Sequence, residues 1–144
     1  MEWLAMTKWP LRIVLAGAGL ALLMGHDGHG CHGCEDSEPI FGPPTQSTCP
    51  PTSTLTYNNF GKSFMERYCT ECHDSDLVGD DRQGAPTFHD FDSLYGIKAV
   101  SNHIDETTAA GPAAVNDGMP QDDPKPTLDE RYQLGEWIAC GMPE

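Results

Sequence analysis

Glycine and proline recur along almost the whole chain, with 15 Gly and 12 Pro among 144 residues. This frequency predicts that much of the backbone is loop and turn. A chain of this length has room for one modest domain and no second core. Because so short and loop-rich a chain buries few apolar side chains, its fold usually needs disulfides, a metal or a bound cofactor for stability. The six cysteines are therefore the residues to consider next.

The charge of the chain is strongly acidic, with 22 Asp and Glu against 8 Lys and Arg and a formal net charge of -14. Nucleic acid is excluded as a partner, because binding it depends on Lys and Arg that neutralise phosphates. An acidic surface favours solubility, and it also complements a basic face on a protein partner. Charge alone does not separate these two roles.

The first 30 residues have the pattern of a signal peptide. Lys8 and Arg12 precede an apolar run over 13–24, which is too short to span a bilayer as a stable anchor. Gly28 and Gly30 supply small residues for cleavage before Cys31. We therefore expect an exported protein in the periplasm, where thiols oxidise.

Cys31 has three possible fates. A cysteine directly after the cleavage site is typical of bacterial lipoproteins, so lipidation would tether the protein to the membrane facing the periplasm, although Gly28 stands where those proteins usually have an aliphatic residue. The run Cys31–Cys34, with His26 and His29 nearby, has metal-ligand residue types, but flexible glycines flank it. A local disulfide or a processing site is the better interpretation.

Residues 31–56 are rich in Pro, Thr, Ser and acidic residues and show no apolar periodicity. Such a composition predicts a tether or a surface wrap in front of the folded domain. We place that domain at residues 57–144.

Three segments of this domain have the apolar spacing of helices. The first runs from Phe60 to about Cys69, after Asn58 and Asn59 as N-cap residues, and puts Phe60, Phe64 and Tyr68 on one face. The second begins after Asp92 and fades near Gly111; its apolar residues are Leu94, Ile97, Val100 and Ile104.

The third helical segment has the clearest signals. Thr127 and Glu130 form a capping box, and Gly141 stands where a helix end favours positive φ. Leu134, Trp137 and Ile138 make the apolar stripe between them. No strand of useful length is indicated, so the expected fold class is all-α.

The motif that carries chemistry is Cys69-Thr70-Glu71-Cys72-His73. CxxCH is the attachment sequence of c-type haem, in which both thiols add to vinyl groups and the histidine becomes an axial iron ligand. A zinc knuckle would need a second Cys or His pair at a fitting distance, and a thioredoxin-type pair would need a βαβ setting. The motif therefore predicts one haem c bound through Cys69, Cys72 and His73.

Residues 57–143 resemble the small single-haem cytochromes c. Members of that family have a glycine eight residues before the first haem cysteine and Leu-x-x-aromatic in the last helix; this chain has Gly61 and Leu134-Gly135-Glu136-Trp137. The resemblance implies a cytochrome c-like fold whose N- and C-terminal helices cross over the haem. It also implies that Phe64, Leu134 and Trp137 close one edge of the haem pocket.

The resemblance further implies a role for Pro86, thirteen residues after His73. Family members have a proline in this region whose backbone carbonyl accepts the Nδ1 proton of the ligand histidine. Such a bond orients the imidazole and makes it a stronger ligand.

The family usually places a methionine on the other side of the iron, in a loop before the last helix. Gly118-Met119-Pro120 fits that description. His103 on the second helix and His89 in a loop are alternative ligands, and an open sixth position is a further alternative. Met65 and Met142 are expected to lie in the core or at the terminus.

Cys49 and Cys140 remain as a pair if Cys31 and Cys34 bind each other or if Cys31 is lipidated. A bridge between them would stabilise the protein by about 2–4 kcal/mol, because it closes a long loop. Sequence alone does not establish the pairing.

Together these features predict an exported, monomeric electron carrier that is not an enzyme, with His73 and Met119 as axial ligands. Thioether ligation raises the reduction potential, and a filled coordination sphere leaves no site for oxygen or peroxide. Its redox partner would present a basic docking face. The alternatives are a haem enzyme or gas sensor with an exchangeable sixth position, and an exported disulfide or metal protein without haem.

Overall fold

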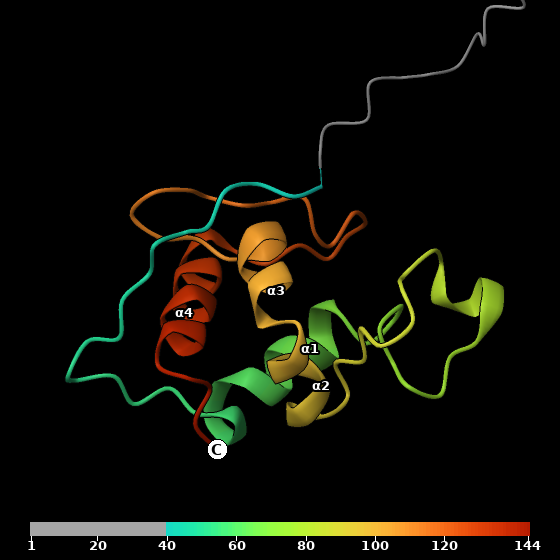
Figure 1. Cartoon of the computed structure of the whole chain (residues 1–144), viewed down its shortest axis with the longest axis horizontal. Coiled ribbons are helices and arrows are strands. Elements are labelled where there is room, and N and C mark those ends of the chain that lie inside the picture. The colour runs from blue at the N-terminus through green and yellow to red at the C-terminus, as the bar shows by residue number, and fades with distance from the viewer. Residues whose placement is uncertain (1–39) are drawn as a thin grey trace, which may run out of the picture. The chain divides into compact units, whose positions relative to one another are not determined.

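Helices joined by long loops make up residues 40–144, the part of the chain that this computed structural model describes (Figure 1). In chain order the elements are the π-helical turn η1 (Tyr57–Gly61), α1 (Lys62–Tyr68), the 3-10 turn η2 (Gly79–Arg82), α2 (Leu94–Ala99), α3 (Ser101–Thr108) and α4 (Leu128–Ala139). Between residues 40 and 144 there is no strand, only an isolated bridge between Ala110 and Val115. The all-α class is confirmed.

Several predictions concern residues outside this range. They are the signal peptide over 1–30, the Cys31–Cys34 run with His26 and His29, the lipidation of Cys31, and the first part of the extension over 31–39. Within the described range, no helix has both the length and the apolar character needed to cross a bilayer.

The first helical segment begins earlier than predicted. Thr56, not Asn58 or Asn59, is the N-cap: its side chain accepts a hydrogen bond from Asn59 N, and the Asn59 side chain accepts one from Thr56 N. This reciprocal pair starts the helical path at Tyr57, three residues ahead of Phe60. The predicted aromatic face is present, with ring centroids of Phe60 and Phe64 5.5 Å apart.

The second segment is two helices rather than one. The backbone leaves helical geometry at Val100, with φ -129° and ψ 28°, between α2 and α3. The break lets α3 change direction and pack against α4 (Figure 1). Ile97 before the break and Ile104 after it are both buried, so the apolar spacing correctly predicted the buried face. The prediction of one continuous helix was wrong.

The last helix is as predicted. Thr127 and Glu130 form the capping box of α4, and Gly141 has a φ of 78° just after it. Gly141 N donates to Ile138 O, and Met142 N donates to Trp137 O, which completes a Schellman motif. Leu134 and Trp137 are fully buried.

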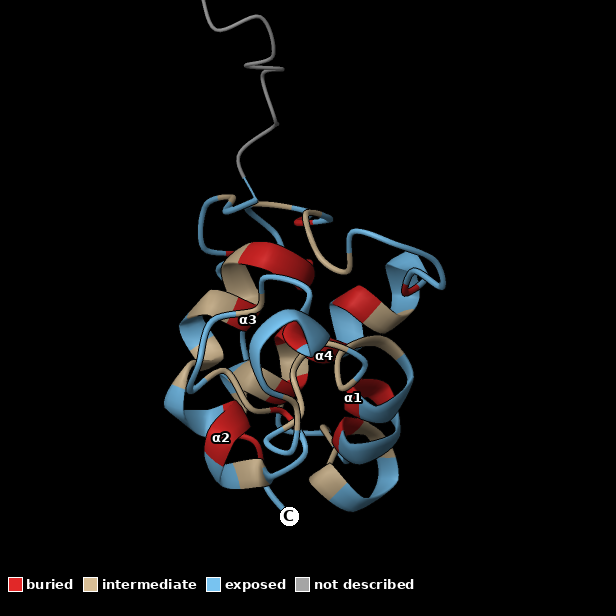
Figure 2. Ribbon diagram, turned by 90° about the vertical axis from the view of Figure 1, so that its right-hand side faces the viewer, coloured by how far each residue is buried: buried red, intermediate tan, exposed pale blue. Residues whose placement is uncertain are grey.

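The core is small and lies between these helices (Figure 2). Its largest fully buried apolar side chains are Met65, Ile97, Leu134 and Trp137. Gly61 lies directly against the Trp137 ring, and a β-carbon there would overlap it. The first and last helical segments therefore meet through the Trp137 side chain.

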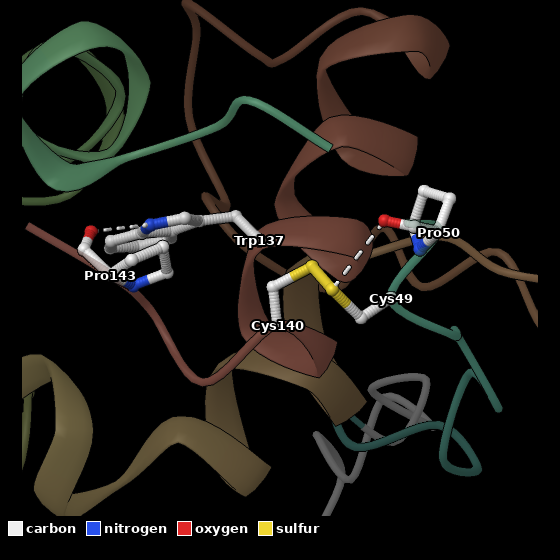
Figure 3. Close-up of a disulfide and its surroundings, with 5 residues drawn as sticks. All are labelled: Cys49, Pro50, Trp137, Cys140 and Pro143. Carbon is white, nitrogen blue, oxygen red and sulfur yellow. Dashed lines mark hydrogen bonds between the residues drawn. A yellow bond between two sulfur atoms is a disulfide. The ribbon is translucent and has the colours of Figure 1, made fainter. Parts of the chain in front are cut away.

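Residues 42–49 lie along α3 and α4. Gly42 N donates to Glu106 O, and Thr45 N donates to the Asp105 carboxylate. Cys49 forms a disulfide with Cys140 at the end of α4, with their Cα atoms 4.7 Å apart (Figure 3). This is the predicted bridge, and it joins the extension to the last helix.

Candidate functional site

A cavity of about 400 Å³ brings most of the predicted site residues together. Cys69, Cys72, His73, Pro86 and Met119 all border it. A wider hollow of about 640 Å³ is bordered by Ile40, Gly42, Pro43, Val115, Asn116, Asp117, Gly118, Gln121 and Lys125. None of the predicted site residues borders that hollow, so the smaller cavity is the candidate site.

The end of α1 presents the two thiols and the imidazole. The helix ends at Tyr68, but turns continue beyond it: Cys72 N donates to Cys69 O at 3.2 Å, and His73 N donates to the same oxygen at 3.0 Å. This tight path brings three chemically active side chains to one cavity within five residues.

Cys69 and Cys72 form no disulfide. Burial raises the pKa of Cys69 to about 12. Burial also raises the pKa of Cys72, with smaller contributions from the charges of Glu71 and Asp122. Both thiols are therefore protonated at neutral pH.

His73 is held in one tautomer. Its Nδ1 lies 3.0 Å from the backbone oxygen of His89, which can only accept, so Nδ1 carries the proton. Burial lowers the pKa of His73, and the neutral ring keeps a lone pair on Nε2. Phe91 stacks on the ring at a centroid distance of 4.4 Å, and its N donates to His73 O. The result is a fixed, neutral imidazole, the form that binds metals.

The carbonyl that binds His73 Nδ1 belongs to His89, so the prediction for Pro86 was wrong. Pro86 O instead accepts a 2.8 Å hydrogen bond from Arg82 Nη2. His89 N donates to Pro86 O at 3.3 Å, and this turn presents the later carbonyl to the imidazole. Pro86 still borders the cavity.

Arg82 organises this loop and was not identified from the sequence. It is only 6% exposed and donates to the backbone oxygens of Asp74, Ala85, Pro86 and His89. Its Nη1 also pairs with Asp90 Oδ1 at 3.0 Å. The sequence does show a single arginine among acidic residues in this loop. Its partners could not be predicted from the sequence, because most of them are backbone oxygens.

Met119 reaches the cavity from the loop between α3 and α4. Its N donates to Thr107 O at 2.9 Å, and its O accepts from Arg131 Nη1 at 3.1 Å. Both backbone groups of this residue are therefore held by helical neighbours. Met65 and Met142 are buried in the core instead, as expected.

His89 and His103 form a pair on the same cavity. His89 Nε2 and His103 Nδ1 are 2.9 Å apart, and the two rings lie nearly parallel. The rings of Phe41 and His103 are nearly perpendicular, with their centroids 5.4 Å apart. This pairing occupies one nitrogen of His103.

Trp137 was predicted to close an edge of the pocket, and this was wrong. It is completely buried in the core and does not border the cavity; neither do Phe64 and Leu134. The ring packs instead against Gly61 and Tyr57, and its Nε1 donates to Pro143 O at 3.4 Å (Figure 3). The spacing that marks a buried aromatic does not specify which neighbour buries it.

Comparisons with known proteins add no identity. No family model, curated protein or solved structure matches the chain. Within residues 40–144, no group of three or more His, Cys, Asp or Glu is arranged to hold a metal ion. A closed zinc site of such ligands therefore has no candidate there. The site must be interpreted from its own chemistry, which is two thiols, a neutral imidazole and a thioether around one cavity.

Proposed function

We propose that this protein is an electron carrier with one haem, covalently attached through Cys69 and Cys72, with His73 and Met119 as axial ligands. The observation that carries the proposal is that these four side chains border one cavity. Met119 lies 46 positions after His73 in the sequence, so only folding brings it to the same cavity as the CxxCH residues. A haem held there supplies one-electron exchange between ferrous and ferric iron.

The residues present fit such a group. Cys69 and Cys72 would hold the group through two thioether bonds, each made by adding a cysteine S–H across one vinyl double bond, so that no atom is left over. His73 offers Nε2 because its Nδ1 proton is bound by His89 O. Aromatic and aliphatic side chains of Tyr68, Phe91 and Ile104 supply apolar surface to the cavity, whose volume lies within the range of cofactor sites.

Met119 favours electron transfer over catalysis. A thioether on the sixth position fills the coordination sphere and raises the reduction potential. Substrate then has no access to the metal, so the residues serve to hold the group and to exclude water. We include in this proposal the cytochrome c-like arrangement of the first and last helices.

The setting of the carrier is also part of the proposal. The predicted signal peptide favours export to the periplasm, with a membrane tether if Cys31 is lipidated. Two of the chain's eight basic residues, Arg82 and Arg131, are buried, so the surface is more acidic than the net charge of -14 indicates. A redox partner with a basic docking face would complement it.

A haem enzyme or gas sensor is the second candidate, favoured by the His89 and His103 pair on the cavity. Such proteins need acid and base groups near an exchangeable iron position. However, the His89 ring is 6.3 Å from the His73 ring, beside the proposed permanent ligand. This proximity favours a supporting role for the pair.

The test is to produce the full chain in a host that attaches haem and to measure its mass after denaturation. We expect the mass of the processed chain plus one haem, and a ferric spectrum with the Met-to-iron band. A Cys69→Ser, Cys72→Ser variant is the control and should carry no covalent haem. Colourless protein with both thiols open to alkylation would reject the proposal, and ready binding of carbon monoxide by the reduced protein would favour the second candidate.

A further inference from the structure

Arg82 and Arg131 are both buried, but of these two only Arg82 forms an ion pair among the described residues. Arg82 is 6% exposed and pairs with the Asp90 carboxylate at 3.0 Å. Arg131 is 4% exposed, and within residues 40–144 no carboxylate lies within 4.0 Å of its guanidinium. Asp117 is the acidic residue whose charge acts on it from further away. Burying a cation without a close counter-ion is costly, so its position calls for an explanation.

The guanidinium of Arg131 binds the loop that carries Met119. Its Nη1 donates to Thr108 O at 2.7 Å, to Asn116 O at 2.8 Å and to Met119 O at 3.1 Å. One nitrogen thus connects Thr108, at the end of α3, to Asn116 and Met119 in the loop that follows. Hydrogen bonds from a charged donor are about twice as strong as neutral ones.

The backbone of Arg131 reinforces this connection. Its oxygen accepts from Ala110 N at 2.9 Å, so the same residue binds the loop through main chain and side chain. Arg131 belongs to the first turn of α4, which the Thr127 capping box fixes. The loop that carries Met119 is therefore bound to α4. The other backbone hydrogen bond of Met119 runs from its N–H to Thr107 O in α3.

We propose that Arg131 is a positioning residue that keeps the Met119 sulfur on the iron and that its buried charge favours the ferrous state. The inference rests on the proposed function. Holding Met119 at its own carbonyl restricts the loop and slows loss of the ligand. A positive charge in a weakly polarisable interior opposes the gain of positive charge when iron is oxidised.

The experiment measures two properties of the haem-loaded protein: the reduction potential, and the affinity of ferric iron for imidazole, which competes with Met119. We expect Arg131→Gln to bind imidazole at least tenfold more tightly than wild type and to have a lower potential. Arg131→Lys keeps the charge but reaches fewer carbonyls. It should bind imidazole at least threefold more tightly while its potential stays closer to wild type than that of Arg131→Gln.

Two matched controls on α2 separate this role from general effects. Lys98→Gln removes the same charge from an exposed position, so its imidazole affinity and potential should stay near wild type. Ile97→Ala removes apolar contacts from a fully buried site that does not border the cavity. It should lower the melting temperature without a tenfold change in imidazole affinity.

The outcomes are distinguishable. Wild type that binds imidazole as tightly as Met119→Leu would show that Met119 is not the ligand, which rejects the ligand set of the proposed function itself. If wild type resists imidazole and Arg131→Gln resists it equally, the inference about Arg131 is wrong. Should Arg131→Gln fail to fold, Arg131→Lys decides, because wild-type imidazole affinity in that variant would overturn the positioning role.

Discussion

At the scale of single residues, one backbone oxygen sets the state of the imidazole on the cavity. His89 O accepts the Nδ1 proton of His73 and also a 3.3 Å bond from Arg82 Nη2. Sharing the oxygen with a cation draws electron density from it and moderates its pull on the imidazole proton. The donor strength of His73 is therefore set jointly by a loop carbonyl and a buried charge.

Replacing Met119 with leucine tests the other proposed ligand at the same scale. Met119→Leu keeps the side-chain volume and removes the sulfur, so we expect loss of the Met-to-iron band, a lower reduction potential and binding of carbon monoxide by the reduced protein. Absorption spectra and a redox titration measure these changes. Met142→Leu is the matched control, because Met142 is buried in the core and does not border the cavity. A spectrum unchanged by Met119→Leu would contradict the assignment.

Gly61 packs directly against the Trp137 ring. Its backbone is ordinary right-handed helix, with φ -57° and ψ -46°, where alanine alone would favour the helix by about 1 kcal/mol. A β-carbon there overlaps the Trp137 ring. We expect Gly61→Ala to lower the free energy of unfolding by about 1–3 kcal/mol in denaturant titrations.

A double-mutant cycle locates the cause of that loss. Trp137→Phe removes part of the ring that meets Gly61, so Gly61→Ala should cost clearly less in that background than in wild type. Equal costs in both backgrounds would show that the overlap is not responsible.

At the scale of elements, the sequence predicted what local signals determine. The capping box of Thr127 and Glu130 and the apolar stripe of Leu134 and Trp137 lie within α4 itself, so its bounds followed from them. The break at Val100 did not follow, because it depends on how α3 packs against α4. At the site, the covalent spacing of CxxCH was visible in the sequence, whereas the His89 carbonyl and the Arg131 contacts join residues that are distant along the chain.

The capping box of α4 gives a pH-dependent prediction. Hydrogen bonding, chiefly from Thr127 N, lowers the pKa of Glu130 in the folded protein. A lowered pKa means that the carboxylate stabilises the fold above its unfolded pKa, about 4.3, and loses this effect as pH falls through the folded value. We expect Glu130→Gln to be less stable than wild type at pH 6, with the difference vanishing under acid conditions.

Thr127→Ala is the control for the carboxylate. It removes the cap hydroxyl, which costs about 1 kcal/mol, but keeps the backbone N–H that is the main cause of the pKa shift. Its stability should therefore retain most of the wild-type pH dependence, measured by denaturant unfolding from pH 6 to pH 3. A pH dependence equal in Glu130→Gln and wild type would contradict the role of this carboxylate.

At the scale of the whole molecule, a disulfide and hydrogen bonds between residues far apart in the sequence add stability that the small core does not supply. Ten hydrophobic residues between positions 40 and 144 are buried. Around them, Arg82, Arg131 and Asn116 each donate to two or more backbone oxygens of loops or of α3. Loops rich in Gly and Pro thus acquire fixed paths through buried polar side chains and the disulfide.

The disulfide between Cys49 and Cys140 joins two positions that are 91 apart in the sequence. Crosslinking removes loop-closure entropy from the unfolded chain, so a Cys49→Ser, Cys140→Ser variant should lose about 2–4 kcal/mol of unfolding free energy. Protease cleavage should also become faster over residues 48–55, while Thr45 stays bound to Asp105. Adding a reductant to wild type should reproduce both effects and leave the stability of the variant unchanged, because the proposed thioether links would not be reduced. Equal stability of variant and wild type would show that the helices and Thr45 alone hold the extension.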